Sequence, residues 1–172
     1  MVLPKNYEGQ ACSMARSLEI VGERWTLLII RDAFYGVRRF NDFIAHLNLP
    51  RAVLTNRLHS LVEENVLVRT KAASGRDEYT LTSKGESLWP VIRSLLDWGD
   101  TYCSDGAPRR LFVHALDNGE LNLSGTCAAC HQQVDIAETL VTPGPGLEDS
   151  EPTPDSITAA LLHPRRMLSP FT

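Results

Sequence analysis

The spacing of apolar residues changes near residue 66, and this change limits the possible folds more than any other feature. Before it, apolar residues recur at the three- and four-residue intervals of amphipathic helices. After it come two short runs rich in Val, Thr and Tyr, which are separated by a small-residue turn typical of a β-hairpin. The predicted elements are helices at 12–21, 23–34, 40–47 and 51–64, strands at 66–71 and 77–82, and a helix at 83–103.

The last of these helices carries two local signals. Ser83 and Glu86 have the spacing of a capping box, so we expect Ser83 to cap the first turn. Pro90 lies inside the helical pattern, where it removes a backbone hydrogen bond, and we expect one helix with a bend at this proline. The residues expected on its buried face are Leu88, Val91, Ile92, Leu95 and Tyr102.

Helices followed by a hairpin and a further helix have the element order of a winged helix-turn-helix. The predicted fold class is therefore mainly α with a small β-wing, followed by a small β-rich C-terminal extension. In such a module one helix enters the major groove of DNA, while the hairpin lies along the backbone or the minor groove. On the helix at 51–64, Leu54, Leu58 and Leu61 share the inward face, which leaves the opposite face for DNA.

The chain of 172 residues has room for one ordinary domain and an appendage. The expected units are a winged-helix DNA-binding domain at 1–106, a small β-rich extension with a Cys-x-x-Cys motif at 107–142, and a Pro-rich acidic tail at 143–172. Short strands are expected in the extension at 111–116, 120–123 and 133–136.

The tail holds six of the ten prolines of the chain. Its acidic residues are Glu148, Asp149, Glu151 and Asp155. Because its apolar content is low, we expect it to be loosely ordered or to lie on a partner.

The net charge of −4 is distributed unevenly. Residues 31–76 hold eight Lys or Arg against four Asp or Glu, a balance of +4, so the rest of the chain carries −8. A basic segment in an acidic chain is typical of a surface that binds a polyanion. The distribution of charge therefore favours a nucleic-acid partner, which the total charge argues against.

The expected DNA contacts lie on the exposed face of the helix at 51–64, before the helix at 40–47, and on the hairpin. An Arg suits guanine, an Asn suits adenine, and the methyl group of a Thr suits thymine. Arg57 points partly back toward the protein, so an ion pair with an acid and a phosphate contact are both open for it. The full set of expected contacts is Arg38, Arg39, Arg51, Thr55, Asn56, Arg57, His59, Arg69, Lys71 and Arg76.

Four motifs carry a family resemblance. They are IVGERWTLLIIRD at 20–32, GVRRFNDF at 36–43, LTNRL at 54–58 and EYTLTSKG at 78–85. With Cys12 before them and Trp98-Gly99 after them, they resemble the HxlR family of bacterial winged-helix regulators. The resemblance implies a homodimeric transcription factor whose first and last helices form the dimer interface. Two-fold symmetry then predicts a pseudo-palindromic operator, with recognition helices roughly 34–36 Å apart, one turn of DNA.

Cys12 directly precedes the first predicted helix. The free N–H groups at a helix N-terminus favour a thiolate there. The resemblance adds that a cysteine at this position is a redox or electrophile sensor in some members of the family. A small buried hydrophobic residue is the alternative interpretation, and the sequence leaves both open.

Cys127 and Cys130 have the spacing of half a zinc site. His114 and His131 are the candidates to complete it, and Asp117 stands where similar extensions of related sequences carry a cysteine. Because a carboxylate replaces a thiolate poorly, the sequence favours a ribbon that is held by packing, with no bound cofactor and with zinc as the alternative.

These observations predict a dimeric, sequence-specific, DNA-binding regulator. Repression that is released by a small ligand or by thiol oxidation is the default interpretation, and the sequence leaves activation open. The alternative is a winged-helix module that binds a ligand or a protein without DNA. Nucleophile elbows and phosphate-binding loops are missing from the sequence, so we expect no enzyme. With no secretory leader and no apolar run of membrane-spanning length, the expected location is the cytoplasm, and no membrane partner is expected.

Overall fold

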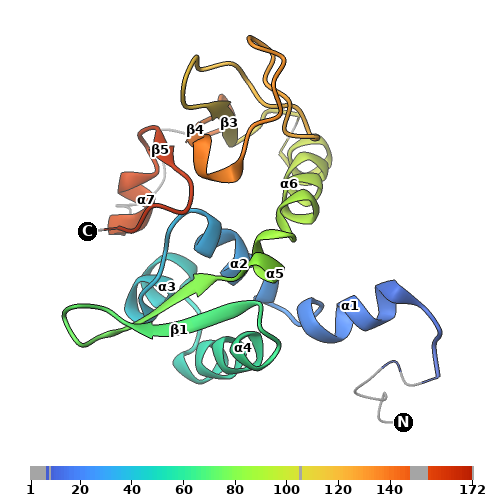
Figure 1. The fold of residues 1–172 in the computed structure, drawn as a ribbon, viewed down its shortest axis with the longest axis vertical. Coiled ribbons are helices and arrows are strands. Elements are labelled where there is room, and N and C mark those ends of the chain that lie inside the picture. The colour runs from blue at the N-terminus through green and yellow to red at the C-terminus, as the bar shows by residue number, and fades with distance from the viewer. Residues whose placement is uncertain (1–6, 8, 105, 148–154, 172) are drawn as a thin grey trace.

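The computed structural model describes residues 7, 9–104, 106–147 and 155–171. The first half holds α1 (Ser13–Val21), α2 (Thr26–Phe34), α3 (Phe40–Leu47), α4 (Arg51–Glu63) and the strands β1 (Leu67–Lys71) and β2 (Asp77–Leu81). The second half holds α5 (Ser83–Glu86), α6 (Trp89–Cys103), β3 (Arg110–His114), the 3-10 helix η1 (Ile136–Glu138), β4 (Thr139–Pro143), α7 (Ser156–Ala160) and β5 (Arg165–Arg166). Figure 1 shows the region of β3 to β5 above the helices α2 to α4, and α1 projecting from the body of the molecule.

The helices α3 and α4 and the β1–β2 hairpin form the predicted winged helix-turn-helix. Asn48 caps the C-terminus of α3, with a left-handed φ of 48°, and donates its N–H to the Ile44 carbonyl. Asn65 follows α4 with φ of 53°, as expected for a residue that replaces glycine after a helix. In the antiparallel hairpin, Leu67 lies opposite Leu81. The predicted fold class, a helical winged module followed by a β-containing region, is confirmed.

The helix predicted from residue 83 is two helices rather than one bent helix. Thr82, and not Ser83, caps α5, because its hydroxyl accepts the hydrogen bond from the Gly85 N–H. Pro90 lies in the first turn of α6. There its missing N–H costs nothing, since the first N–H groups of a helix have no carbonyl partner within it.

The C-terminal region is an antiparallel sheet in the order β3–β4–β5. The strand expected at 111–116 is confirmed as β3. The pieces expected at 120–123 and 133–136 form isolated bridges in place of strands, and Ile136 begins η1. The strands β4 and β5 were not predicted.

The expectation of a loosely ordered tail is wrong for residues 155–171. The Asp155 carboxylate caps α7 by accepting from the backbone N–H groups of Ile157 (2.8 Å) and Thr158 (3.1 Å). Ile157, Leu161 and Met167 are buried. The few apolar residues of the tail are therefore placed where they complete the core of the preceding chain. Glu148, Asp149 and Glu151 lie outside the described residues.

A single cluster of buried residues joins the winged module to the C-terminal sheet. Trp89 is central to this junction, because its ring lies 4.9 Å from that of Phe34 in α2 and 5.1 Å from that of Phe112 in β3. Offset aromatic rings at such separations attract each other beyond the burial of their area. The first turn of α6 is thus fixed against both halves of the molecule.

The end of the tail also contacts the loop between α2 and α3. The Leu168 N–H donates to the Phe34 carbonyl (2.8 Å), and the Arg38 guanidinium donates to the Leu168 carbonyl (2.8 Å). Gly36 has φ of +97°, and a Cβ there would lie 1.8 Å from the Ser169 carbonyl oxygen. The tail therefore approaches this loop so closely that only glycine fits.

We predict that Gly36→Ala lowers the free energy of unfolding by about 1–3 kcal/mol, because it adds backbone strain and displaces the tail. Urea denaturation measures the loss. Gly75→Ala is the control, since Gly75 has φ of +76° with no atom within 4 Å of an added Cβ. The contact between tail and loop predicts a larger loss at Gly36, and equal losses would contradict it.

Candidate nucleic-acid interface

The exposed face of α4 carries polar side chains along its N-terminal half. Leu54, Leu58 and Leu61 are buried, whereas Arg51, Thr55, Asn56 and His59 are exposed, as the apolar spacing predicts. This division of α4 into an inward apolar face and an outward polar face leaves the polar face accessible to a macromolecule.

Arg51 is held at the start of α4 by residues of α3. Its guanidinium donates to the Asn41 side-chain oxygen (3.2 Å) and lies 5.6 Å from the centre of the Phe40 ring. The Thr55 hydroxyl donates to the Arg51 carbonyl one turn earlier in the helix (2.9 Å). Contacts within the helix-turn-helix therefore set the position of the Arg51 guanidinium.

Two of the expected DNA contacts have acidic partners on this side of the molecule. Arg57 lies 3.7 Å from the carboxylate of Glu23, so the structure contains the ion pair that was one of its two interpretations. The His59 Nδ1 lies 3.0 Å from a carboxylate oxygen of Glu63 on the same helix.

The hairpin carries a charge cluster that the sequence does not reveal. The Asp77 carboxylate accepts hydrogen bonds from Arg69 and from Lys71, whose Nζ lies 2.7 Å away. The hydrogen bond from Arg69, followed by that from Lys71, lowers the pKa of Asp77 to about 2. Asp77 is thus negatively charged at neutral pH and offsets part of the positive charge of the wing. Arg76 has no acidic partner within the part of the chain that the structure describes.

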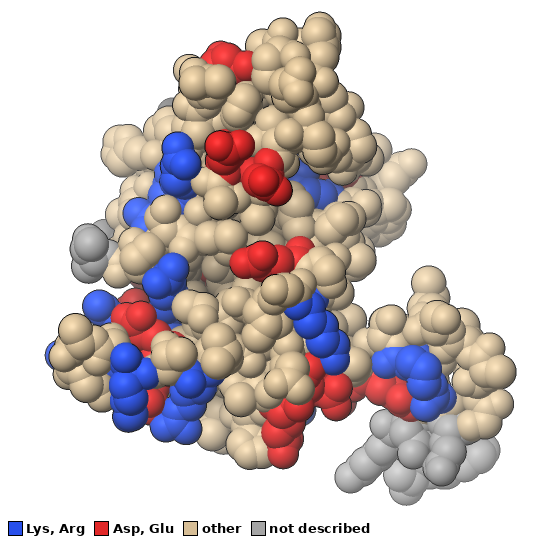
Figure 2. All heavy atoms as spheres, viewed as in Figure 1, with Lys and Arg blue, Asp and Glu red and all other residues tan. Residues whose placement is uncertain are grey.

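A groove of about 620 Å³ lies between the hairpin and the start of α3. Three basic side chains line it, Arg39, Lys71 and Arg76, together with Asp42 and Asp77. Figure 2 shows Lys and Arg side chains gathered at the hairpin end of the molecule, with acidic side chains among them.

Arg38 and Arg39 point in different directions. Arg38 is half-buried and donates to the tail at Leu168, so the structure does not bring it to the exposed face with Arg51. The Arg39 Nε lies 3.5 Å from a carboxylate oxygen of Glu78 in β2. The Arg38 contact is not predictable from local sequence, because its partner lies 130 residues away.

Large apolar side chains are exposed on α1 and α6. On α1 these are Met14 (70% exposed) and Leu18. On α6, Ile92 is the buried residue, whereas Val91, Leu95, Trp98 and Tyr102 are exposed. The expectation that Val91, Leu95 and Tyr102 pack inside the same chain is therefore wrong. We refer to these residues as the apolar faces of α1 and α6.

Cys12 is exposed at the N-cap of α1, and its side chain makes no capping hydrogen bond. Its interpretation as a buried hydrophobic residue is wrong for this chain. Cys103, near the end of α6, is also an exposed free thiol.

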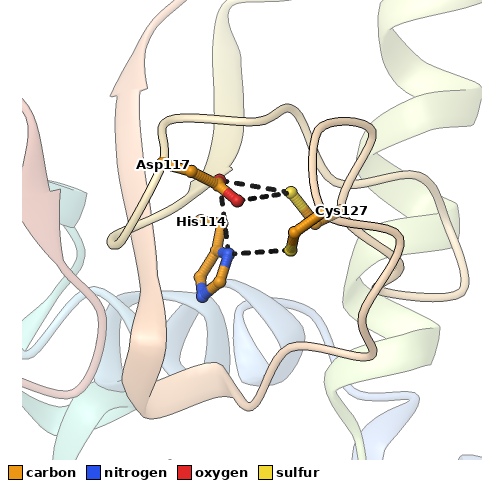
Figure 3. Close-up of side chains that lie close together, drawn as sticks. His114, Asp117 and Cys127 are labelled. Atoms are coloured by element: carbon orange, nitrogen blue, oxygen red, sulfur yellow. Dashed lines mark hydrogen bonds and ion pairs between the residues drawn. The ribbon is translucent and has the colours of Figure 1, made fainter.

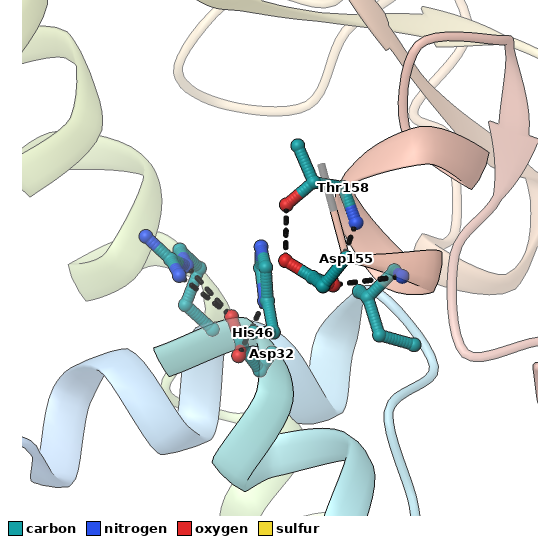
Figure 4. A network of polar contacts seen from close by, with 6 residues as sticks. Asp32, His46, Asp155 and Thr158 are labelled. Atoms are coloured by element: carbon teal, nitrogen blue, oxygen red, sulfur yellow. Dashed lines mark hydrogen bonds and ion pairs between the residues drawn. The ribbon is translucent and has the colours of Figure 1, made fainter. Parts of the chain in front are cut away.

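A second cavity, of about 340 Å³, lies beside α6. Arg31 and His46 line it, and both contact the buried carboxylate of Asp32 at 2.7 Å. Figure 4 shows His46 of α3 between Asp32 and the start of α7. Tyr35 also lines the cavity, and burial raises the pKa of its hydroxyl, which remains a neutral hydrogen-bond donor.

The extension brings four potential metal ligands together (Figure 3). They are His114, Asp117, Cys127 and Cys130, whose ligand atoms all lie within 4.8 Å of one another. His131, which the sequence analysis named as a candidate ligand, lies outside this group, and Asp117 is its fourth member.

The fold and the exposed polar helix define a winged helix-turn-helix protein. The family model of the HxlR-like helix-turn-helix matches residues 20–107, and the chain belongs to that family. Among the described residues, no helix combines the length and the hydropathy needed to cross a membrane.

Relatives extend the match beyond the winged module. The HTH-type transcriptional regulator Rv3095 of Mycobacterium tuberculosis (strain ATCC 25618 / H37Rv) is 39% identical over 151 residues, which are 85% of this chain and 93% of that protein. The HTH-type transcriptional regulator YdeP of Bacillus subtilis (strain 168) is 32% identical and covers 56% of this chain and 77% of its own length. The crystal structure of PA1607, a transcription-factor candidate, is 35% identical, with a TM-score of 0.53 over 74% of this chain and 82% of that one. This chain is therefore a transcriptional regulator of the helix-turn-helix type.

Proposed function

We propose that the protein is a cytoplasmic homodimer that binds a pseudo-palindromic operator and represses transcription. The observation that carries this proposal is the exposed polar face of α4, which lies beside a groove lined by Arg39, Lys71 and Arg76. An exposed helix with a basic hairpin beside it matches the way winged modules contact the major groove and the phosphates.

The roles of the side chains follow from their positions. Arg51, Thr55 and Asn56 contact base edges in the major groove. Arg39, Arg69, Lys71 and Arg76 contact phosphates, which place the protein on DNA without reading sequence. Arg57 and His59 lie at the margin of this surface, where Glu23 and Glu63 compete with phosphate for them. Arg38 supports the surface from within, through its hydrogen bond to the tail.

We predict that Arg51→Ala weakens operator binding by about 1–3 kcal/mol and relaxes the preference at one base position. The reason is the loss of a guanidinium that α3 holds in place, at Asn41 and Phe40. Fluorescence anisotropy with operator and mutated-operator duplexes measures both effects. Arg166→Ala, an exposed arginine of β5, is the matched control and should bind as the wild type does. Wild-type affinity and selectivity in Arg51→Ala would refute the assignment of α4.

Asp77→Asn should tighten DNA binding, because it removes the negative charge that pairs with Arg69 and Lys71. The slope of log K against log salt should become steeper by roughly 0.9, the value of one further phosphate contact. Anisotropy titrations at several salt concentrations measure it. Asp135→Asn changes the net charge equally at an exposed residue of the extension and is the control. Equal effects of the two variants would show that only total charge matters.

The second copy in the proposed dimer covers the apolar faces of α1 and α6. Within its own chain α1 buries only Ala15 and Val21 among the described residues, and it projects from the body in Figure 1. On α6, the rings of Trp98 and Tyr102 lie 5.4 Å apart and are 58% and 71% exposed. Such large apolar surfaces mark interaction sites, and two faces on one chain suit a two-fold interface.

We predict that Trp98→Glu converts the dimer into a monomer, because it places a charge inside the proposed interface. Analytical ultracentrifugation measures the mass at several concentrations. Leu123→Glu makes a similar change at a leucine of the extension that is 47% exposed, and it should leave the dimer intact. Dimers that persist in Trp98→Glu would place the interface elsewhere.

We propose two signals that release the protein from its operator, a small ligand and thiol oxidation. A small ligand is supported by the cavity beside α6, which lies against the helix that is proposed to form the dimer. Oxidation is supported by the exposure of Cys12 at the start of α1, the other dimer helix. Either signal acts by changing the distance between the two copies of α4, and a bias of a few kcal/mol is enough to shift such an equilibrium.

A further inference from the structure

The cluster in the extension has the dimensions of a tetrahedral metal site. The His114 Nδ1 and the Cys127 Sγ each lie 3.3 Å from Asp117 Oδ1, and the Cys130 Sγ lies 3.5 Å from His114 Nδ1. Bonds of roughly 2.0–2.3 Å to a tetrahedral zinc ion place its ligands about 3.3–3.8 Å apart. Three of the six pairs of ligand atoms therefore already have this spacing, and all four ligand atoms lie within 4.8 Å of one another.

Two backbone turns of the same form present these side chains. In each turn two residues separate the ligands, His114 from Asp117 and Cys127 from Cys130. The N–H of the residue after the second ligand donates to the carbonyl of the first ligand, over 2.9 Å in one turn and 3.0 Å in the other. That residue is Asn118 or His131, and both have φ of 58°. The two matched turns bring the four ligand atoms within 4.8 Å of one another.

Backbone N–H groups also stabilise the negative ligand atoms. The Gly119 N–H donates to Asp117 Oδ1 (2.9 Å), and the Ala129 N–H donates to the Cys127 Sγ (3.4 Å). Such outer hydrogen bonds orient the ligands of metal sites. An added Cβ at Gly119 would lie 2.3 Å from the Cys127 Sγ, so the two turns meet at the distance that only glycine permits.

The chain around the cluster has a small apolar core and little regular secondary structure. Between β3 and η1, residues 115–135 form only isolated bridges. Their buried apolar cluster contains Leu121, Cys127 and Val134, with Cys130 packed against it. Both cysteines are free thiols, so no disulfide replaces a core here. Small units of this kind depend on a metal or a disulfide for stability.

We propose that His114, Asp117, Cys127 and Cys130 bind one Zn²⁺ ion as a structural site. Two thiolates and an imidazole favour zinc over magnesium or calcium, and four protein ligands leave no open position for catalysis. On binding, the two thiol protons leave to solvent as the two Zn–S bonds form. His131, which the sequence also nominated, is exposed and is not a ligand. The bound ion joins the turn at 114–118 to the turn at 127–131.

Metal analysis and cobalt titration of the full chain test this proposal. Purified protein should contain about one zinc per chain, and chelator-treated protein should bind Co²⁺ with the intense visible bands of tetrahedral thiolate coordination. Asp117→Asn keeps an acceptor for the Gly119 N–H, so the turn is retained, and it should weaken Co²⁺ binding at least about tenfold. The matched control is His131→Ala, which should bind as the wild type does.

Amide exchange of residues 115–135 gives a second readout. It should quicken when zinc is removed from the wild type, while exchange in α2 changes little. A wild-type chain without a tetrahedral Co²⁺ spectrum would overturn the proposal. So would Co²⁺ binding that Asp117→Asn leaves unchanged, or that His131→Ala abolishes.

Discussion

The packing of Trp89 between Phe34 and Phe112 is the interaction on which the arrangement of this molecule depends. It fixes the first turn of α6 to the core of the winged module on one side and to the C-terminal sheet on the other. The exposed residues Trp98 and Tyr102 lie further along the same helix. The direction in which α6 presents its apolar face, and hence the proposed spacing of two α4 helices in a dimer, follows from this buried contact.

Several basic residues of the winged module contact the tail or acidic side chains, which reduces the positive charge that is available to DNA. Arg38, counted with the basic residues of the winged module, is directed to the tail carbonyl at Leu168. Asp77 neutralises part of the wing, and Glu23 and Glu78 lie against Arg57 and Arg39. The positive balance of this segment therefore overstates the charge that is available to phosphates, and Arg51 and Arg76 are the exposed cations of this region without an acidic partner among the described residues.

The sequence predicted the parts of the fold that depend on local spacing. Signals within a few residues of one another predict the apolar faces of α3 and α4, the turn between β1 and β2, and the left-handed conformation of Asn65. Features whose partners are distant in the chain were not predicted. These are the packed tail and the contact of Arg38. The exposure of apolar residues on α6 was not predicted either, because this amphipathic helix has no partner for that face among the described residues of its own chain. For β4, the run Thr139-Leu140-Val141-Thr142 was a usable β-branched signal that was missed. The sequence identifies Asp117 as a poor replacement for a thiolate, but only the folded structure shows that its carboxylate contacts the Cys127 thiol.

The most direct test of operator binding by a two-fold dimer is selection of bound duplexes from a random-sequence DNA pool by the full chain. We expect enrichment of two inverted half-sites whose centres lie about one helical turn apart, because a two-fold dimer presents its two α4 helices to successive major grooves. Enrichment of no sequence, or of a single unpaired site or direct repeats, would exclude operator binding by a two-fold dimer.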